Sequence, residues 1–117
     1  MNDLVSKHET LCEKLNEIYE QKNTAYGNSF GDTYKKLGII SAVTRISDKY
    51  NRLVNLATHP NINKGDEAIE DTLLDMANYC LMTVMELEYE RDKKTEDIEK
   101  ILERYGEMPN IEEDDCK

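Results

Sequence analysis

Apolar residues recur at intervals of three and four along most of this chain, the spacing of helices that bury one face. The pattern predicts a helix over roughly residues 2–21, a second over 33–57, a third over 67–91 and a short fourth over 95–106. The stripe of the first helix consists of Leu4, His8, Leu11, Leu15 and Ile18. The glycines and prolines cluster between these segments, which favours long helices over short strands. We therefore predict an all-α fold of four helices.

Capping and helix-breaking residues set the predicted boundaries. Residues 23–32 interrupt the helical pattern with glycine, asparagine and serine, and Asp32 is the expected N-cap of the second helix. A loop over 58–65 leads to Asp66, the expected cap of the third helix. A pair of lysines marks a break before Thr95, which is expected to cap the fourth helix.

The second and third predicted helices carry charged residues opposite their main apolar stripes. The stripe of the second consists of Ile39, Val43, Ile46, Tyr50 and Val54. The stripe of the third consists of Ile69, Leu73, Met76, Ala77, Cys80, Val84 and Leu87. Opposite these stripes lie Arg45, Asp48 and Arg52 on one helix, and Asp71, Asp75 and Asn78 on the other. Because Met82 and Met85 share the polar side and Leu74 a flank, we expect the third helix to be buried on both sides and its acids to be shielded from water.

Length and charge limit the classes of protein to which this chain can belong. At 117 residues the chain is one domain, which we assign to residues 1–106, followed by an acidic tail over 107–117. The net charge of −10 argues against a nucleic-acid duplex as partner, since phosphate binding over a wide surface needs a basic field. A small pocket with local positive charge remains compatible with that balance.

The three cysteines show no metal-binding spacing. Cys12 and Cys80 fall on apolar helix faces, so we expect them to be small core residues of a protein in a reducing compartment. No signal peptide is recognisable and no window is long and apolar enough to span a membrane. These features predict a cytoplasmic protein.

The charged faces suggest a site between the second and third helices. Asp71 and Asp75, at i and i+4, could hold Mg²⁺ with Asp48 as third ligand and with water and substrate phosphates completing the shell. Arg45 and Arg52 could bind phosphate oxygens in forked hydrogen bonds. The predicted ligand-binding set is Lys22, Asn23, Tyr26, Phe30, Arg45, Asp48, Lys49, Arg52, Asp71, Asp75 and Asn78. The alternative is a purely structural network in which Arg45 and Arg52 pair with Asp71 and Asp75.

The aromatic residues Tyr26 and Phe30 are unusual in a connecting loop. They either plug the end of the helical bundle, or one of them stacks on the base of a nucleotide.

Three runs carry a family resemblance: KNTAYGNSFG, RISDKYNRLVNL and EDTLLDMANY, in that order. They resemble the nucleotide modification associated domain family, which is frequent in phages and prophages. That family is similar in helical layout to the MazG-like all-α nucleoside triphosphate pyrophosphohydrolases. The resemblance implies a MazG-like four-helix bundle completed by oligomerisation, a nucleotide ligand and, for a phage protein, the cytoplasm of the host cell.

The chain departs from the MazG-like enzymes at their metal ligands. Those enzymes hold Mg²⁺ with an ExxE motif on one helix and ExxD on the next. The corresponding runs here begin with Arg45 and Thr72, so that only Asp48 and Asp75 are carried over, with Asp71 one position displaced. Pyrophosphate hydrolysis needs metal to activate water and offset charge. We therefore expect this chain to retain phosphate binding while it loses hydrolysis.

Three hypotheses follow from the sequence. The first is a nucleotide-binding protein that sequesters a phosphorylated nucleotide, or a nucleotide signal in evasion of host defence, with little or no hydrolysis. The second is a Mg²⁺-dependent nucleotide pyrophosphohydrolase using Asp48, Asp71 and Asp75. The third is a structural oligomer with a polar seam. Each is expected to form a homodimer or a higher homo-oligomer.

Overall fold

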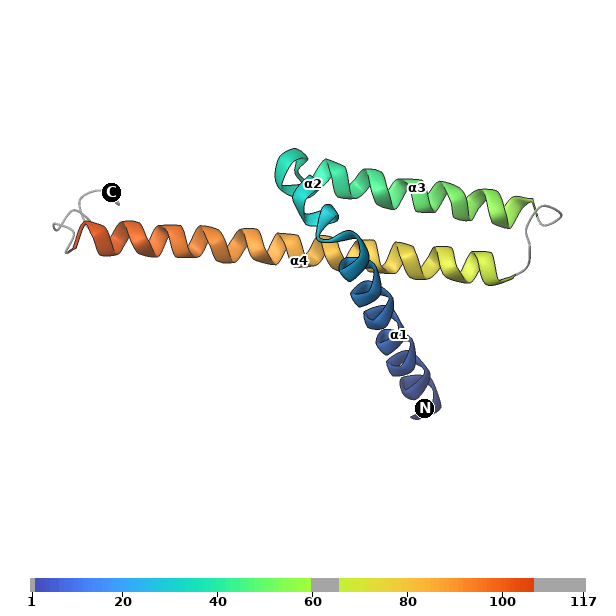
Figure 1. Ribbon diagram of the computed structural model, residues 1–117. Coiled ribbons are helices and arrows are strands. Elements are labelled where there is room, and N and C mark those ends of the chain that lie inside the picture. The colour runs from blue at the N-terminus through green and yellow to red at the C-terminus, as the bar shows by residue number, and fades with distance from the viewer. Residues whose placement is uncertain (1, 60–65, 107–117) are drawn as a thin grey trace, which may run out of the picture. The chain divides into compact units, whose positions relative to one another are not determined.

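The computed structural model describes residues 2–59 and 66–106, and that part of the chain is entirely helical (Figure 1). The helices are α1 (Asn2–Tyr26), α2 (Ser29–Leu37), α3 (Ile39–Thr58) and α4 (Asp66–Arg104). The predicted all-α class is confirmed and the described chain has four helices as predicted, but the bounds of every predicted helix differ from those observed. The predicted acidic tail and most of the loop before α4 lie outside the described residues.

The chain divides into two compact units, Met1–Glu86 and Leu87–Lys117. The first unit contains α1, α2, α3 and the first half of α4. The described part of the second unit is the rest of α4 and two further residues, all of them exposed. All residues discussed below as a site belong to the first unit.

The turn between α1 and α2 is shorter than the sequence suggests. α1 continues through Tyr26, and only Gly27 and Asn28 separate it from α2. Gly27 has a φ of +69°, a left-handed conformation that glycine adopts without strain. The N-cap of α2 is Asn28, whose side-chain oxygen accepts a hydrogen bond from the Gly31 N–H (3.3 Å). The prediction of Asp32 as cap was therefore wrong, because Asp32 lies in the first turn of α2.

The predicted second helix is in fact two helices that meet at Gly38. Its φ of +76° and ψ of −164° interrupt the helical backbone between Leu37 and Ile39. The Gly38 N–H still donates to the Tyr34 carbonyl, and the Gly38 carbonyl accepts a hydrogen bond from the Ser41 hydroxyl (2.8 Å). A single glycine in an otherwise continuous helical pattern is a weak stop signal, which explains why the pattern did not reveal the bend.

The predicted third and fourth helices form one helix of 39 residues, α4. It begins at Asp66 itself and contains neither glycine nor proline, so nothing in its backbone ends it early. Thr95, predicted to cap a separate helix, donates its hydroxyl to the Arg91 carbonyl (3.0 Å) within α4. The predicted break at the two preceding lysines was wrong.

The core of the first unit lies where α2 packs on α3 and α4. Phe30, Tyr34 and Ala42 are its buried apolar residues, with Tyr79 and Met82 partly buried against them. The rings of Phe30 and Tyr79 stack with their centroids 5.8 Å apart. Cys12 and Cys80 are both exposed, so the prediction that they are core residues was wrong.

Polar residues of α4 take part in this interior. Thr72 is 2% exposed and donates its hydroxyl to the Ala68 carbonyl (2.7 Å), and the buried Thr83 donates to the Tyr79 carbonyl (2.7 Å). The buried Asn78 amide donates from Nδ2 to the Leu15 carbonyl of α1 (3.1 Å). Each buried side chain thus has a hydrogen bond that offsets its desolvation.

The main apolar stripes of α3 and α4, by contrast, are largely exposed. Asp75 is shielded as predicted, but Asp71, Asp48 and Arg52 are exposed, contrary to the expectation of buried charge. The polar side of α4 meets α1 and α3 at Asp75 and Asn78, which find partners there, whereas Asp71 lies about 40° around the helix from Asp75 and stays exposed. The apolar stripes consequently face away from the rest of the first unit. Among the described residues, no helix has an apolar stretch that would cross a membrane.

Replacing Gly38 with alanine should lower the free energy of unfolding by about 1–3 kcal/mol, because a left-handed φ with this ψ is a conformation open essentially to glycine alone. No atom lies within 4 Å of the Cβ that the substitution adds, so the loss would be conformational rather than steric. Urea denaturation at one fixed protein concentration measures it. Leu37→Ala, at the exposed neighbouring position, is the control and should change stability far less. Equal stability of Gly38→Ala and the parent would refute the strained bend.

Candidate ligand-binding site

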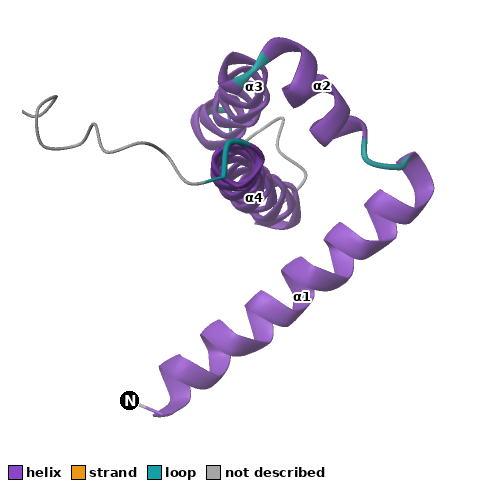
Figure 2. Cartoon of the chain, turned by 90° about the vertical axis from the view of Figure 1, so that its left-hand side faces the viewer, coloured by secondary structure: helices purple, strands orange, loops and turns teal. Residues whose placement is uncertain are grey.

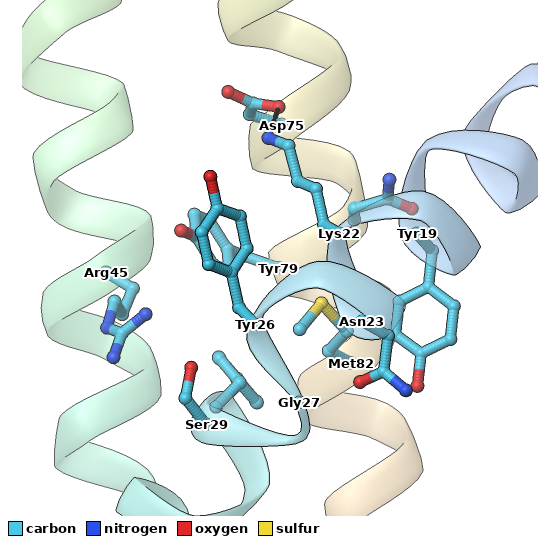
Figure 3. A pocket seen from close by; sticks show the side chains of 12 residues that line it. Tyr19, Lys22, Asn23, Tyr26, Gly27, Ser29, Arg45, Asp75, Tyr79 and Met82 are labelled. Atoms are coloured by element: carbon cyan, nitrogen blue, oxygen red, sulfur yellow. Dashed lines mark hydrogen bonds and ion pairs between the residues drawn. The ribbon is translucent and has the colours of Figure 1, made fainter.

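A cavity of about 350 Å³ lies in the first unit, between the end of α1, the turn after it, α3 and α4 (Figure 3). Its volume is at the lower end of the roughly 300–1,000 Å³ typical of small-molecule sites. The residues that line it are Tyr19, Lys22, Asn23, Tyr26, Gly27, Ser29, Phe30, Arg45, Asp75, Asn78, Tyr79 and Met82. The lining combines aromatic rings, two amides and both signs of charge.

Asp75 joins three helices at the wall of this cavity. Lys22 of α1 donates from Nζ to Asp75 Oδ1 (2.9 Å), and Lys49 of α3 donates from Nζ to Oδ2 (3.1 Å). The Asp75 side chain is 24% exposed and that of Lys22 is 56% exposed. Burial alone raises the pKa of Asp75, but the hydrogen bonds and positive charges of Lys22 and Lys49 outweigh it and hold the pKa below the usual 3.8.

Asn78 ties the cavity wall to α1 through its hydrogen bond to the Leu15 carbonyl. This bond uses only the amide nitrogen of the side chain. Among the described residues, the Asn78 amide oxygen has no donor, although the residue is buried and lines the cavity. An acceptor of this kind is available to a hydroxyl or amino group of a ligand.

Arg45 projects from α3 toward the cavity, as Figure 3 shows, and is half-buried. Within residues 2–59 and 66–106, no carboxylate forms an ion pair with it, since the ion pairs there both belong to Asp75. Arg52 is different, because its Nε donates to the Thr72 hydroxyl (3.2 Å) and it does not line the cavity. The structural network predicted as an alternative, with both arginines paired to Asp71 and Asp75, is absent from the described chain.

The two aromatic residues singled out in the sequence have different surroundings. Phe30 is buried and stacks on Tyr79, so it fills the end of the helical core. Tyr26 is 75% exposed at the end of α1 and lines the cavity, so its ring is open to a ligand. Tyr19 lines the cavity as well.

The structure brings together most of the predicted site residues. Those that line the cavity are Lys22, Asn23, Tyr26, Phe30, Arg45, Asp75 and Asn78. Lys49 does not line the cavity, but it donates a hydrogen bond to Asp75, which does. Asp48, Arg52 and Asp71 are not among the residues that line it. Sequence reasoning missed Tyr19, Gly27, Ser29, Tyr79 and Met82. Tyr19 precedes Lys22 by three residues and Tyr79 follows Asp75 by four, so helical spacing from the predicted residues would have identified both.

The acids predicted to hold Mg²⁺ do not form a cluster. Within the described chain, no three His, Cys, Asp or Glu side chains lie close enough together to hold a metal ion. Asp48 and Asp71 are exposed, whereas both carboxylate oxygens of Asp75 accept hydrogen bonds from lysines. The structure therefore provides cations, rather than a set of acids, at this cavity.

Comparison with models of known protein families gave a match over more than half of the chain. The model of the family described as nucleotide modification associated domain 1 matches residues 22–87, more than half of the chain. The matched region contains every residue that lines the cavity except Tyr19, and it ends one residue after the first compact unit. No curated protein and no solved structure gave a significant match.

The stability that Asp75 provides should disappear in acid. Since the folded-state pKa lies below the usual 3.8, ionised Asp75 favours the folded state above that value, and this contribution fades as pH falls below it. The difference in melting temperature between the parent and Asp75→Asn should therefore be largest near neutral pH and shrink as pH falls below about 4. Asp48→Asn, at an exposed position that has no ion pair within the described residues, is the control. A difference between parent and Asp75→Asn that stays constant with pH would refute the proposed role.

Proposed function

The chain belongs to the nucleotide modification associated domain 1 family, and on that premise we propose that its cavity binds a phosphorylated nucleotide. The observation that carries the proposal is the half-buried Arg45 beside the cavity, without an anionic partner in the described chain. A desolvated guanidinium without a counter-charge is unfavourable, and a phosphate group offers it paired, charge-assisted hydrogen bonds.

The local charge supports an anionic ligand despite the acidity of the whole chain. Lys22 and Arg45 line the cavity and Lys49 lies behind Asp75, which is the one acid among the lining residues. The site therefore has an excess of positive charge in a protein whose net charge is −10. A positive field attracts phosphate, whereas a neutral nucleoside has no charge for it to attract.

The rest of the lining suits the other parts of a nucleotide. The open ring of Tyr26 offers a face on which a base can stack. The amides of Asn23 and Asn78 offer hydrogen bonds to a base or a sugar hydroxyl, and the free amide oxygen of Asn78 is the most shielded of these groups.

We propose further that the protein retains its ligand with little or no hydrolysis. Where the MazG-like enzymes place acids, this chain has Arg45 beside the cavity and Thr72 in a hydrogen bond to its own helix. A cation and a buried hydroxyl cannot replace carboxylates as metal ligands for water activation. Such a protein would sequester a nucleotide or a nucleotide signal, the role expected of a phage-type member that counters host defence.

Arg45→Ala should weaken binding of a phosphorylated nucleotide about 30-fold or more, about 2 kcal/mol, because it removes the charged partner of the phosphate. Isothermal titration with a panel of nucleosides and their mono-, di- and triphosphates measures this. Arg52→Ala is the matched control, since it removes an arginine seven residues further along α3. Arg52 donates a hydrogen bond to Thr72 and does not line the cavity. Its affinity should stay close to that of the parent. Failure of the whole panel to bind would refute the proposed function.

Binding should also survive removal of divalent metal. With EDTA the affinity is expected to change by less than about tenfold, or about 1.4 kcal/mol, because arginine and lysine supply the counter-charge. Chromatography of the nucleotide after incubation with protein and Mg²⁺ should recover it intact. Release of pyrophosphate that EDTA abolishes would instead establish the pyrophosphohydrolase, and absence of both binding and turnover would favour the structural oligomer.

A further inference from the structure

The cavity has two cationic side chains that can bind the same anionic group. Arg45 of α3 has no ion pair within the described residues, and Lys22 of α1 uses only one of its ammonium protons in the hydrogen bond to Asp75. Both side chains line one cavity of about 350 Å³, and Figure 3 shows them on different helices at its edge. Because both side chains are long, a single phosphate group in a cavity of this size can accept hydrogen bonds from each.

The charged groups at the cavity leave a net charge of +2 among the described residues. Lys22, Arg45 and Lys49 are three cations, and Asp75 is the acid of the lining. A phosphate monoester carries a charge of about −1.5 to −2 at pH 7 and has three terminal oxygens. That charge balances the cavity, and the oxygens suffice for the fork of Arg45 and a further bond from Lys22. A phosphate diester has a smaller charge and fewer free oxygens, so it would leave the cavity positive.

Longer phosphate chains suit the same lining less well. Each further phosphate adds negative charge, for which the described lining has no further cation, in a protein whose net charge is −10. Mg²⁺ bound to the phosphates would offset that charge, but it would lie beside Arg45 and Lys22, which repel it. No three acids of the described chain lie close enough together to hold it. The volume of the cavity, near the lower end of the usual range, also favours the smaller ligand.

We propose that the ligand is a nucleoside monophosphate whose phosphate lies between Arg45 and Lys22. This inference rests on the proposed nucleotide binding, and it adds the number of phosphates and the type of ester, which that function leaves open. The fork of Arg45 can hold a group with a single negative charge. The second negative charge of a monoester is therefore the one that Lys22 recognises.

Isothermal titration of the full chain compares each common nucleoside 5′-monophosphate with its di- and triphosphate and its 3′,5′-cyclic form, once with EDTA and once with Mg²⁺. In both conditions the 5′-monophosphate should bind at least about tenfold more tightly than the other forms of the same nucleoside. Equal or tighter binding of another form would overturn the inference and leave the proposed function standing. Binding by none of the compounds would instead refute the proposed function itself.

A nucleoside 5′-sulfate is the matched control ligand, because a sulfate ester has the shape of a phosphate monoester but a single negative charge. At pH 7.5 it should bind at least about tenfold less tightly than the 5′-monophosphate. Between pH 7.5 and 5.5 the affinity for the monophosphate should fall about fourfold, since the second pKa of the phosphate is about 6, whereas the affinity for the sulfate should not change. Neither His8 nor His59 lines the cavity, so no histidine of the site titrates in this window. Equal affinities for the two ligands would overturn the inference.

Lys22→Met removes the ammonium group and keeps an apolar side chain of similar length. It should reduce the preference for monophosphate over sulfate to less than about threefold. Lys14→Met, at an exposed position of α1 that does not line the cavity, is the matched control and should leave the preference unchanged. The preference is measured within each variant, so a general loss of affinity or stability does not alter it. A full preference in Lys22→Met would overturn the assignment of Lys22.

Discussion

The arrangement of the first unit depends on one carboxylate. Asp75 accepts a hydrogen bond from Lys22 on α1 and another from Lys49 on α3, so a single side chain of α4 fixes the positions of both neighbouring helices. The apolar core between these helices is small, and polar contacts therefore determine which faces meet. The hydrogen bond from Asn78 to the Leu15 carbonyl reinforces the same arrangement on the α1 side.

Burying polar residues costs desolvation free energy, which hydrogen bonds to nearby groups offset. A buried hydroxyl or amide must find a partner, and Thr72, Asn78 and Thr83 each do so in the backbone. Arg45 is half-buried beside the cavity, and the described chain offers it no such partner. The contrast between satisfied neighbours and one unsatisfied guanidinium is what separates a binding site from an internal polar network, and it is the basis of the proposed phosphate contact.

The sequence was sufficient for the all-α class and for seven of the residues that line the cavity, but not for the helix boundaries or for the orientation of the helices. A period of three and four residues identifies a stripe without identifying what covers it, so the main stripe of α4 was assigned to the interior and its acids to a shared seam. Local signals also misled. Gly38 ends a helix although one glycine is usually tolerated, and Thr95 continues one although threonine often caps. Asp71 was expected beside Asp75 because they are one turn apart, yet a shift of about 40° is enough to expose it to solvent.

Asp75 has two lysine partners where one would neutralise it, and this redundancy affects how a ligand can enter. If a phosphate draws Lys22 away, Lys49 remains bonded to the other carboxylate oxygen, so the shielded acid is never left without a counterion. Lys22 is the more exposed of the two lysines and reorients at a lower cost in lost contacts. The cavity thus has one cation that can exchange partners, Lys22, beside the unpaired Arg45 of the described chain, and under the proposed function a phosphate would bind by a transfer of partners rather than by the exposure of a bare charge.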